Sequence, residues 1–338
     1  MMWFIFAILC ILGWGMADLF YKLGSDDDDR YSHLKIAVWV GLVMGVCALC
    51  LLPMTETLTK DDSMSIAQKM LRYAPASMSY IISMVIGYAG LRYLELSIVS
   101  PVQNASGAIS AIIMTGYFML TAKDPAMAIA EETGFVLQPE SGREMTCNLL
   151  IAGGTALIIA GVIALAVAEQ RMAAGGEVKR EERKYRYGAM AMIFPLLYCV
   201  FDTAGTAADG ILLSEEAGAG FGEMDVLVLY GLTFLLCGAV SWAILRIKTG
   251  KWYNPFARGE RTKGVAAVCE EFGQVFYVYA MAERPVTAAP MVASYCIVSV
   301  ILSRFIVGEK LEKAQLAGVL PVIFGIVMLG LAEGLGAA

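Results

Sequence analysis

The sequence predicts an all-α integral membrane protein with ten transmembrane helices, arranged as two inverted five-helix repeats. Of the 338 residues, 58% are hydrophobic and only 17% are charged. The mean hydropathy is +0.66, which is typical of chains that cross a bilayer several times. Apolar runs of about 20 residues, the length that spans a bilayer, recur along the whole chain. Similar polar motifs also occur at corresponding places in the two halves.

Ten apolar runs are long enough to cross the bilayer as helices. We expect the first to be a retained helix, because it has neither a basic region before it nor a cleavage site of small residues after it. The predicted spans are Trp3–Leu23, Lys35–Pro53, Pro75–Tyr93, Ile98–Thr121, Cys147–Ala168, Gly188–Leu213, Asp225–Leu245, Gly264–Ala282, Val286–Val307 and Ala314–Leu331.

A stretch rich in lysine, arginine and glutamate, residues 169–187, is predicted to be a charged linker between the repeats. It separates a first five-helix repeat, residues 1–168, from a second, residues 188–338. Five spans per repeat is an odd number, so the second repeat must enter the bilayer in the opposite direction. Inverted repeats of this kind are typical of secondary transporters, which bind substrate near the bilayer midplane between the two halves.

Two pairs of motifs support this division. Trp14 precedes Asp18 by one helical turn in the first span, and Tyr198 precedes Asp202 by one turn in the sixth. The turns that follow the third span of each repeat also correspond. Each carries a glutamate followed by a proline, Glu95 and Pro101 in one and Glu283 and Pro290 in the other.

Carboxylates inside the apolar spans are the main functional signal. Asp202 and Asp209 are seven residues apart, which places them near one stripe of one helix. A charged group at the bilayer centre costs roughly 2.5–3.5 kcal/mol, so these side chains are expected to face a wet cavity rather than lipid. Asp202 has no basic residue within reach on its own helix and is the strongest candidate. Asp209 lies near the end of its span, where an interfacial carboxylate is the alternative.

Two further spans carry acidic residues. Asp18 in the first span is four residues before Lys22, so an ion pair within the helix is available to it. In the eighth span, Glu270, Gln274 and Tyr277 form a polar stripe at the spacing i, i+4, i+7, which we assign to the same cavity.

Acidic and aromatic side chains on cavity-facing stripes predict a receptacle for a cation. An aromatic face attracts an ammonium group by roughly 0.5–2 kcal/mol. An anionic substrate would require a lysine or arginine at mid-span, and none is well placed. The predicted substrate-binding residues are Trp14, Asp18, Asn104, Tyr198, Asp202, Asp209, Glu270, Gln274, Tyr277 and Tyr295.

The predicted function is secondary active or facilitated transport of a small cationic or amine-bearing metabolite, such as a quaternary ammonium compound or a polyamine, by alternating access. Export of amino acids or other neutral metabolites is the alternative, with a substrate carboxylate met by helix N-termini or by Asn104. A carboxylate that exchanges a proton for the cation would couple transport to a proton gradient. Transport driven by the membrane potential needs no such exchange, since one charge moving through 100 mV yields about 2.3 kcal/mol.

Several short motifs resemble those of a known transporter family. They are Trp14-Gly15 with Lys22 in the first span, the two proline turns, Gly308-Glu309-Lys310-Leu311 after the ninth span, and Leu316-Ala317-Gly318 at the start of the tenth. Together they resemble the ten-helix, EamA-type branch of the drug/metabolite transporter superfamily over nearly the whole chain. The first half departs from the pattern, because Thr121-Ala122-Lys123-Asp124 stands where a Gly-Glu-x-Leu motif would follow the fourth span. The resemblance implies a multi-pass protein of the plasma or inner membrane.

Other classes of function are not expected. The net charge of −6 and the lack of a basic stripe argue against a nucleic-acid partner. The only histidine is His33, and the acidic run Asp26–Asp29 lacks the spacing of a calcium loop, so no metal site or cofactor is predicted. A membrane-embedded enzyme or a sensor is the remote alternative. No catalytic set and no phosphate-binding loop occurs, and no connection between spans is long enough for the soluble output domain of a sensor. The partners expected are therefore a small-molecule substrate and the lipid bilayer.

The orientation in the membrane stays open. The odd-numbered connections carry 15 lysines and arginines and the even-numbered ones carry six, which by the positive-inside rule places both termini outside. Proteins that the chain resembles keep both termini in the cytoplasm.

Overall fold

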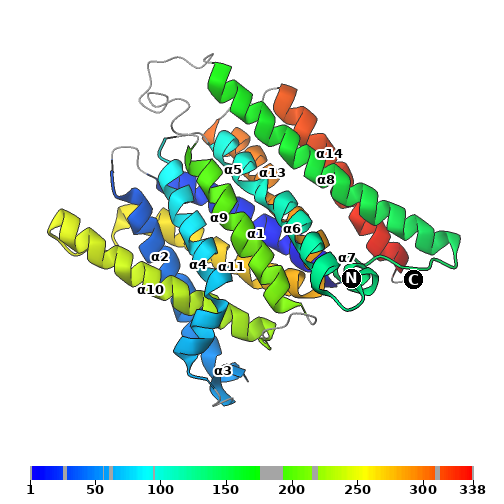
Figure 1. Ribbon diagram of the computed structural model, residues 1–338. Coiled ribbons are helices and arrows are strands. Elements are labelled where there is room, and N and C mark those ends of the chain that lie inside the picture. The colour runs from blue at the N-terminus through cyan, green and yellow to red at the C-terminus, as the bar shows by residue number, and fades with distance from the viewer. Residues whose placement is uncertain are drawn as a thin grey trace.

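The computed structural model describes residues 2–25, 29–55, 57–60, 64–93, 96–175, 193–214, 220–308 and 313–336. Within these ranges the regular structure is helical (Figure 1). The helices are α1 (Met2–Gly24), α2 (Ser32–Leu51), α3 (Thr57–Lys60), α4 (Ile66–Gly90), α5 (Leu96–Asn104), α6 (Ser106–Thr121), α7 (Pro125–Thr133), α8 (Gly142–Gly175), α9 (Ile193–Leu213), α10 (Glu223–Thr249), α11 (Arg261–Glu283), α12 (Pro285–Ala293), α13 (Tyr295–Leu302) and α14 (Lys313–Gly336).

Within the described ranges, seven helical segments are long and apolar enough to cross a membrane, which confirms an all-helical, multi-pass membrane protein. The other predicted spans lie on α4, on α5 with α6, and on α11. These are helical too, but α4 begins with the polar turn that carries Lys69 and Arg72, and α11 carries Glu270 and Glu271. The qualifying segments are Met2–Gly24, Ser32–Met54, Gly142–Leu165, Ile193–Leu213, Glu223–Thr249, Pro285–Ile306 and Leu316–Gly336.

The predicted linker at 169–187 begins inside a helix. Helix α8 continues past Ala168 to Gly175, and the remaining linker residues lie outside the described ranges. Glu95 of the first proline turn and most of the acidic run at 26–29 also fall outside them.

Helices from the two halves of the chain pack against each other. Helix α1 lies along α11, α4 along α9, α2 along α10, and α8 along α14. Figure 1 shows the α8–α14 pair at one edge of the bundle and α2 with α10 at the opposite edge. The α8–α14 contact depends on glycine, because a Cβ atom on Gly161 would lie 2.7 Å from the main-chain oxygen of Gly318. Close approach of this kind is typical of helix interfaces in membranes.

Two helices of the bundle are interrupted near their middle. The first break, at Ala105, separates α5 from α6, and the second, at Ser294, separates α12 from α13. At the first, Asn104 Nδ2 donates to the main-chain oxygen of Ser100 at 2.7 Å. At the second, Ser294 Oγ donates to the main-chain oxygen of Met291 at 2.6 Å. At these breaks, side chains donate hydrogen bonds to main-chain oxygens, which in a continuous helix would be bonded by main-chain N–H groups.

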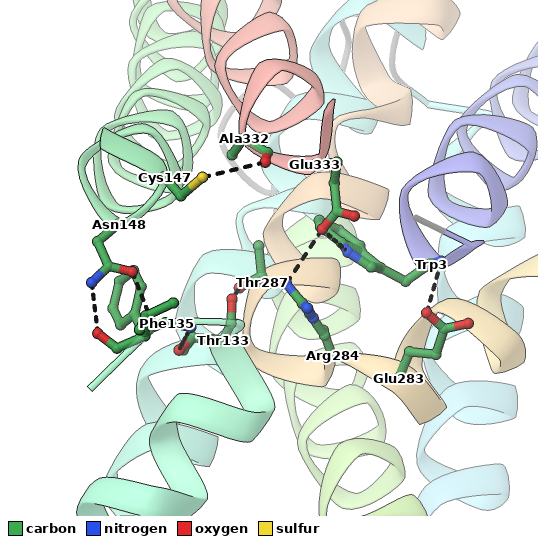
Figure 2. A network of polar contacts seen from close by, with 11 residues as sticks. Trp3, Thr133, Phe135, Cys147, Asn148, Glu283, Arg284, Thr287, Ala332 and Glu333 are labelled. Atoms are coloured by element: carbon green, nitrogen blue, oxygen red, sulfur yellow. Dashed lines mark hydrogen bonds and ion pairs between the residues drawn. The ribbon is translucent and has the colours of Figure 1, made fainter. Parts of the chain in front are cut away.

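Polar contacts tie together the end of the bundle where the two termini lie (Figures 1 and 2). The main-chain N–H of Trp3 donates to Glu283 Oε2 at 2.9 Å, and its indole Nε1–H donates to Glu333 Oε1 at 2.5 Å. The Arg284 guanidinium also reaches Glu333 Oε1, at 3.3 Å. The start of α1, the turn between α11 and α12, and the end of α14 are thereby joined at this end.

A charged cluster lies at the opposite end of α1. Lys35 Nζ contacts Asp29 Oδ2 at 2.7 Å and Glu260 Oε1 at 3.5 Å, and Lys263 Nζ contacts Glu260 Oε2 at 2.7 Å. Partial burial opposes ionisation of Asp29 and Glu260. The hydrogen bonds and charges of the lysines outweigh this effect and lower the pKa of both carboxyl groups.

Replacing Lys35 by methionine is expected to reduce stability at neutral pH but not in acid. A carboxyl whose pKa is lowered by folding stabilises the fold above its ordinary pKa, here 3.8 for Asp29 and 4.5 for Glu260, and loses that contribution as the pH falls through the lowered value. Because the groups are partly exposed, the difference should be at most about 1 kcal/mol. Thermal unfolding of wild type and Lys35→Met between pH 7 and pH 3 checks this; a difference that does not shrink in acid would contradict it.

Candidate functional site

Two adjoining cavities lie in the interior of the bundle. The space free of atoms, open solvent included, is about 370 Å³ in the first and about 330 Å³ in the second. Asp18 and Glu270 line the first cavity, together with Gln103, whereas Asp202 and Asn104 line the second. No lysine or arginine is among the residues that line either cavity. Four aromatic side chains line both, namely Trp14, Tyr80, Tyr198 and Tyr295.

Asp202 is buried on α9 and faces the second cavity. Ser106, the first residue of α6, donates its hydroxyl to Asp202 Oδ2 at 2.5 Å. The break at Ala105 places the N-terminus of α6 at this point, and helix N-termini carry partial positive charge. The carboxylate is therefore held by a hydroxyl group and a helix N-terminus rather than by a basic side chain.

Asp18 faces the first cavity from α1. Ser100 of α5 and Ser299 of α13 both donate to its Oδ2, at 2.6 Å and 2.8 Å. The ion pair with Lys22 that the sequence allows is not formed; Lys22 Nζ instead donates to the main-chain oxygen of Leu91 at 2.6 Å. Asp18 is thus oriented by two serines from the two interrupted helices.

The three side chains of the predicted polar stripe on α11 lie in different places. Glu270 lines the first cavity and accepts a hydrogen bond from Tyr80 Oη at 2.5 Å, while Tyr277 lines the second. Gln274 lines neither cavity and is fully buried, with no partner for either amide atom among the described residues. A shared stripe on one helix therefore does not place all three side chains in one cavity.

Asp209 lies outside both cavities, at the centre of a cluster of tyrosines. Tyr73 of α4 and Tyr230 of α10 donate to its two carboxylate oxygens. Tyr277 of α11 donates to Oδ2 at 2.9 Å. The carboxylate is 1% exposed, so it connects four helices in the interior rather than lying at the membrane surface.

Trp14 is the centre of the aromatic group between the cavities. Its ring centroid lies 5.0 Å from that of Tyr277, 5.6 Å from that of Tyr295 and 6.2 Å from that of Tyr80. Its indole nitrogen is buried without a hydrogen-bond partner among the described residues. Helix α11 makes room for the ring at Gly273, where a Cβ atom would lie 2.2 Å from the indole. Trp14 thereby lines both cavities.

The sequence did not single out Tyr80, although it lines both cavities and bonds Glu270. One signal for it exists. Tyr73 and Tyr80 are seven residues apart on α4 and therefore share a stripe, and both donate to buried acids. Nothing in the local sequence indicates which acids they meet.

Comparisons with known proteins agree with this architecture. A solved structure titled only "Crystal structure of protein" is similar over 97% of both chains, with a TM-score of 0.57 and 10% sequence identity. At this identity the similarity shows the fold alone. No curated protein matches the sequence significantly. Residues 217–331 match the model of the EamA-like transporter family. This match confirms the resemblance to the drug/metabolite transporter superfamily over residues 217–331: the chain carries an EamA-like transporter region, and its apolar helices are those of a multi-pass membrane protein.

Proposed function

We propose that this protein transports a small organic cation across the cell membrane by alternating access, with the two central cavities as its binding site. One observation carries the proposal. Three carboxylates line the cavities, and no lysine or arginine does; Asp202 and Glu270 are buried, and Asp18 is partly buried. An unpaired charge buried away from water costs several kcal/mol, so either a bound cation or a proton must neutralise each group.

The aromatic walls support the same substrate class. Trp14, Tyr80, Tyr198 and Tyr295 surround both cavities, and ammonium groups are attracted to such ring faces. Tyr277 adds a fifth ring at the second cavity. An acidic and aromatic lining of this kind suits an amine or a quaternary ammonium ion better than an anion.

An amino acid is the alternative substrate, and the geometry disfavours it. Its carboxylate would have to be met by a helix N-terminus or by Asn104. The N-terminus of α6 already faces Asp202 through Ser106, and Asn104 Nδ2 donates to its own helix at Ser100. The positions suited to a substrate carboxylate are therefore taken by groups of the protein itself.

The proposed mechanism requires two inverted repeats of five spans each, with α1, α2, α4, α5–α6 and α8 corresponding to α9, α10, α11, α12–α13 and α14. The pairing of helices supports this. If each helix is replaced by its counterpart in the other repeat, the α1–α11 contact becomes the α9–α4 contact. The α2–α10 and α8–α14 contacts each join a helix to its own counterpart and are therefore unchanged. The two breaks, at Ala105 and Ser294, also correspond. Halves that fail to superpose about an axis in the membrane plane would contradict the repeat.

Uptake into proteoliposomes tests the proposed function. Purified protein should accumulate labelled tetramethylammonium or choline when the membrane potential is negative inside, and it should not accumulate glutamate or glucose phosphate. A pH gradient should drive the same uptake without a potential only if a proton is exchanged for the cation. Uptake of the anions in preference to the cations would contradict the proposal.

Replacing Trp14 by alanine is expected to weaken binding of tetramethylammonium without loss of folded protein. The lost ring face should cost about 1–2 kcal/mol, which is roughly five- to thirtyfold in affinity. Isothermal titration of the purified variant measures the change. Trp242→Ala is the matched control, because that tryptophan is partly exposed and packs on Trp252 outside the cavities. Unchanged affinity in Trp14→Ala would mean that the aromatic group serves only packing.

A further inference from the structure

We infer that the two cavities together form a two-point site for a linear diamine, with one ammonium group in each cavity and the carbon chain along the aromatic walls between them. The inference rests on the proposed function and narrows its substrate class. Its basis is the division of the carboxylates, with Asp18 and Glu270 in the first cavity and Asp202 in the second.

The carboxylates lie on opposite sides of the aromatic group. Trp14 and Tyr198 each line both cavities, and each is one turn before an aspartate on its own helix. Helices α1 and α9 run in opposite directions (Figure 1). Asp18 therefore lies beyond the rings toward one end of the bundle, and Asp202 lies beyond them toward the other.

Contacts at the turn between α11 and α12 establish the opposite directions of these helices. Trp3, at the start of α1, donates to Glu283 in this turn. Gly210, near the end of α9, lies so close to Pro285 that an added Cβ atom would be 2.8 Å from that ring. The start of one helix and the end of the other thus meet the same turn.

The spacing suits a short diamine. One turn of four residues rises about 6 Å, so the two aspartates are separated by roughly 12 Å along the bundle. An ammonium nitrogen lies about 3 Å from the carboxylate that it meets, which leaves roughly 6 Å between the two nitrogens. An extended chain advances about 1.2 Å per bond, so about four methylene groups cover this gap.

A single positive charge would leave one cavity uncompensated. An ammonium ion at Asp202 does not neutralise the charge of Asp18, whose described hydrogen-bond partners are the hydroxyls of Ser100 and Ser299. A dication places one positive charge in each cavity, so that only one of the three carboxylates, Asp18 or Glu270, is left to be neutralised by a proton. The entropy cost of ordering one ligand is then set against two ionic contacts. Hydroxyl groups from different helices hold the acids in place before the ligand arrives.

An unpartnered polar group at the first cavity points independently to a ligand. The amide nitrogen of Gln103 is buried and has no hydrogen-bond partner among the described residues. Gln103 lines the first cavity, beside Asp18 and Glu270. Rotation of its amide would present the carbonyl oxygen, which accepts a hydrogen bond from an ammonium group. Buried groups of this kind are normally satisfied, so their presence in a cavity suggests a polar occupant.

Titration calorimetry of the full chain in detergent tests the inference with putrescine and butylamine, which have the same carbon chain and differ by one ammonium group. We expect putrescine to bind at least tenfold more tightly. Asp202→Asn should reduce putrescine affinity at least tenfold and leave butylamine affinity within about threefold, because the first cavity keeps its acids. Glu131→Gln, at an exposed position outside the cavities, is the control and should change neither value.

A series of diamines with two to eight methylene groups keeps the test independent of any variant. Affinity of the wild type should peak near four methylenes. Equal affinity for putrescine, butylamine and tetramethylammonium, or no dependence on chain length, would overturn the diamine site while leaving cation transport intact. Failure of every amine to bind, with binding of a neutral or anionic metabolite, would overturn the proposed function as well.

Discussion

Replacing Asp202 by asparagine is expected to abolish cation transport while leaving the amount of folded protein unchanged. Asparagine keeps the shape of the side chain and an oxygen that can accept the hydrogen bond from Ser106, so only the charge is removed. In the second cavity no other carboxylate is present to replace it. Uptake of labelled tetramethylammonium and putrescine into proteoliposomes should fall at least tenfold, and size-exclusion chromatography should show the same folded yield.

The pH dependence of binding distinguishes the two ways in which Asp202 can be neutral. If a proton leaves the carboxylate when the cation binds, wild-type affinity should increase with pH across that titration, and Asp202→Asn should lack this increase. Glu131→Gln, an exposed substitution away from both cavities, should behave like wild type. Normal transport by Asp202→Asn at every pH would mean that this carboxylate is structural.

Asp209→Ala is expected to cost most of the stability of the fold. The substitution removes the acceptor for the hydroxyl groups of Tyr73, Tyr230 and Tyr277 at once. Each buried donor left without a partner costs about 1–3 kcal/mol, so the loss should reach several kcal/mol. The thermal unfolding midpoint and the yield of purified protein measure the effect.

Tyr277→Phe is the graded comparison, because it removes one donor and leaves the carboxylate with two. It should cost only about 1 kcal/mol. If Asp209→Ala unfolds within a degree or two of wild type but no longer binds cations, then Asp209 is a substrate ligand, as the sequence predicted, and the tyrosine cluster is not what stabilises the bundle.

Much of the fold could be predicted from the sequence, because a bilayer requires helices of about 20 apolar residues wherever the chain crosses it. The first predicted span, Trp3–Leu23, lies within α1, for example, and the sixth ends with α9 at Leu213. The aromatic and acidic pairs on these helices, Trp14 with Asp18 and Tyr198 with Asp202, were evident from the same local spacing. All four residues line the central cavities.

The partners of those residues could not be predicted, because they come from distant parts of the chain. Asp209 accepts from Tyr73, which is 136 residues away, and Asp18 accepts from Ser299, which is 281 residues away. The periodicity of one helix indicates which side chains share a face, but not what covers that face. For the same reason Gln274 was assigned to a cavity that it does not line, and Tyr80 was not identified.

The acidic, aromatic cavities are proposed to select positive charge. The most direct measurement is equilibrium binding of choline and of its neutral isostere, in which carbon replaces the quaternary nitrogen, to the purified wild-type protein. The two molecules have nearly the same shape and differ by one charge. We expect choline to bind and to be displaced by putrescine. The isostere should bind at least tenfold more weakly, a difference of about 1.4 kcal/mol or more. Equal binding of choline and the isostere would show that the cavities recognise shape alone, and would contradict the central claim.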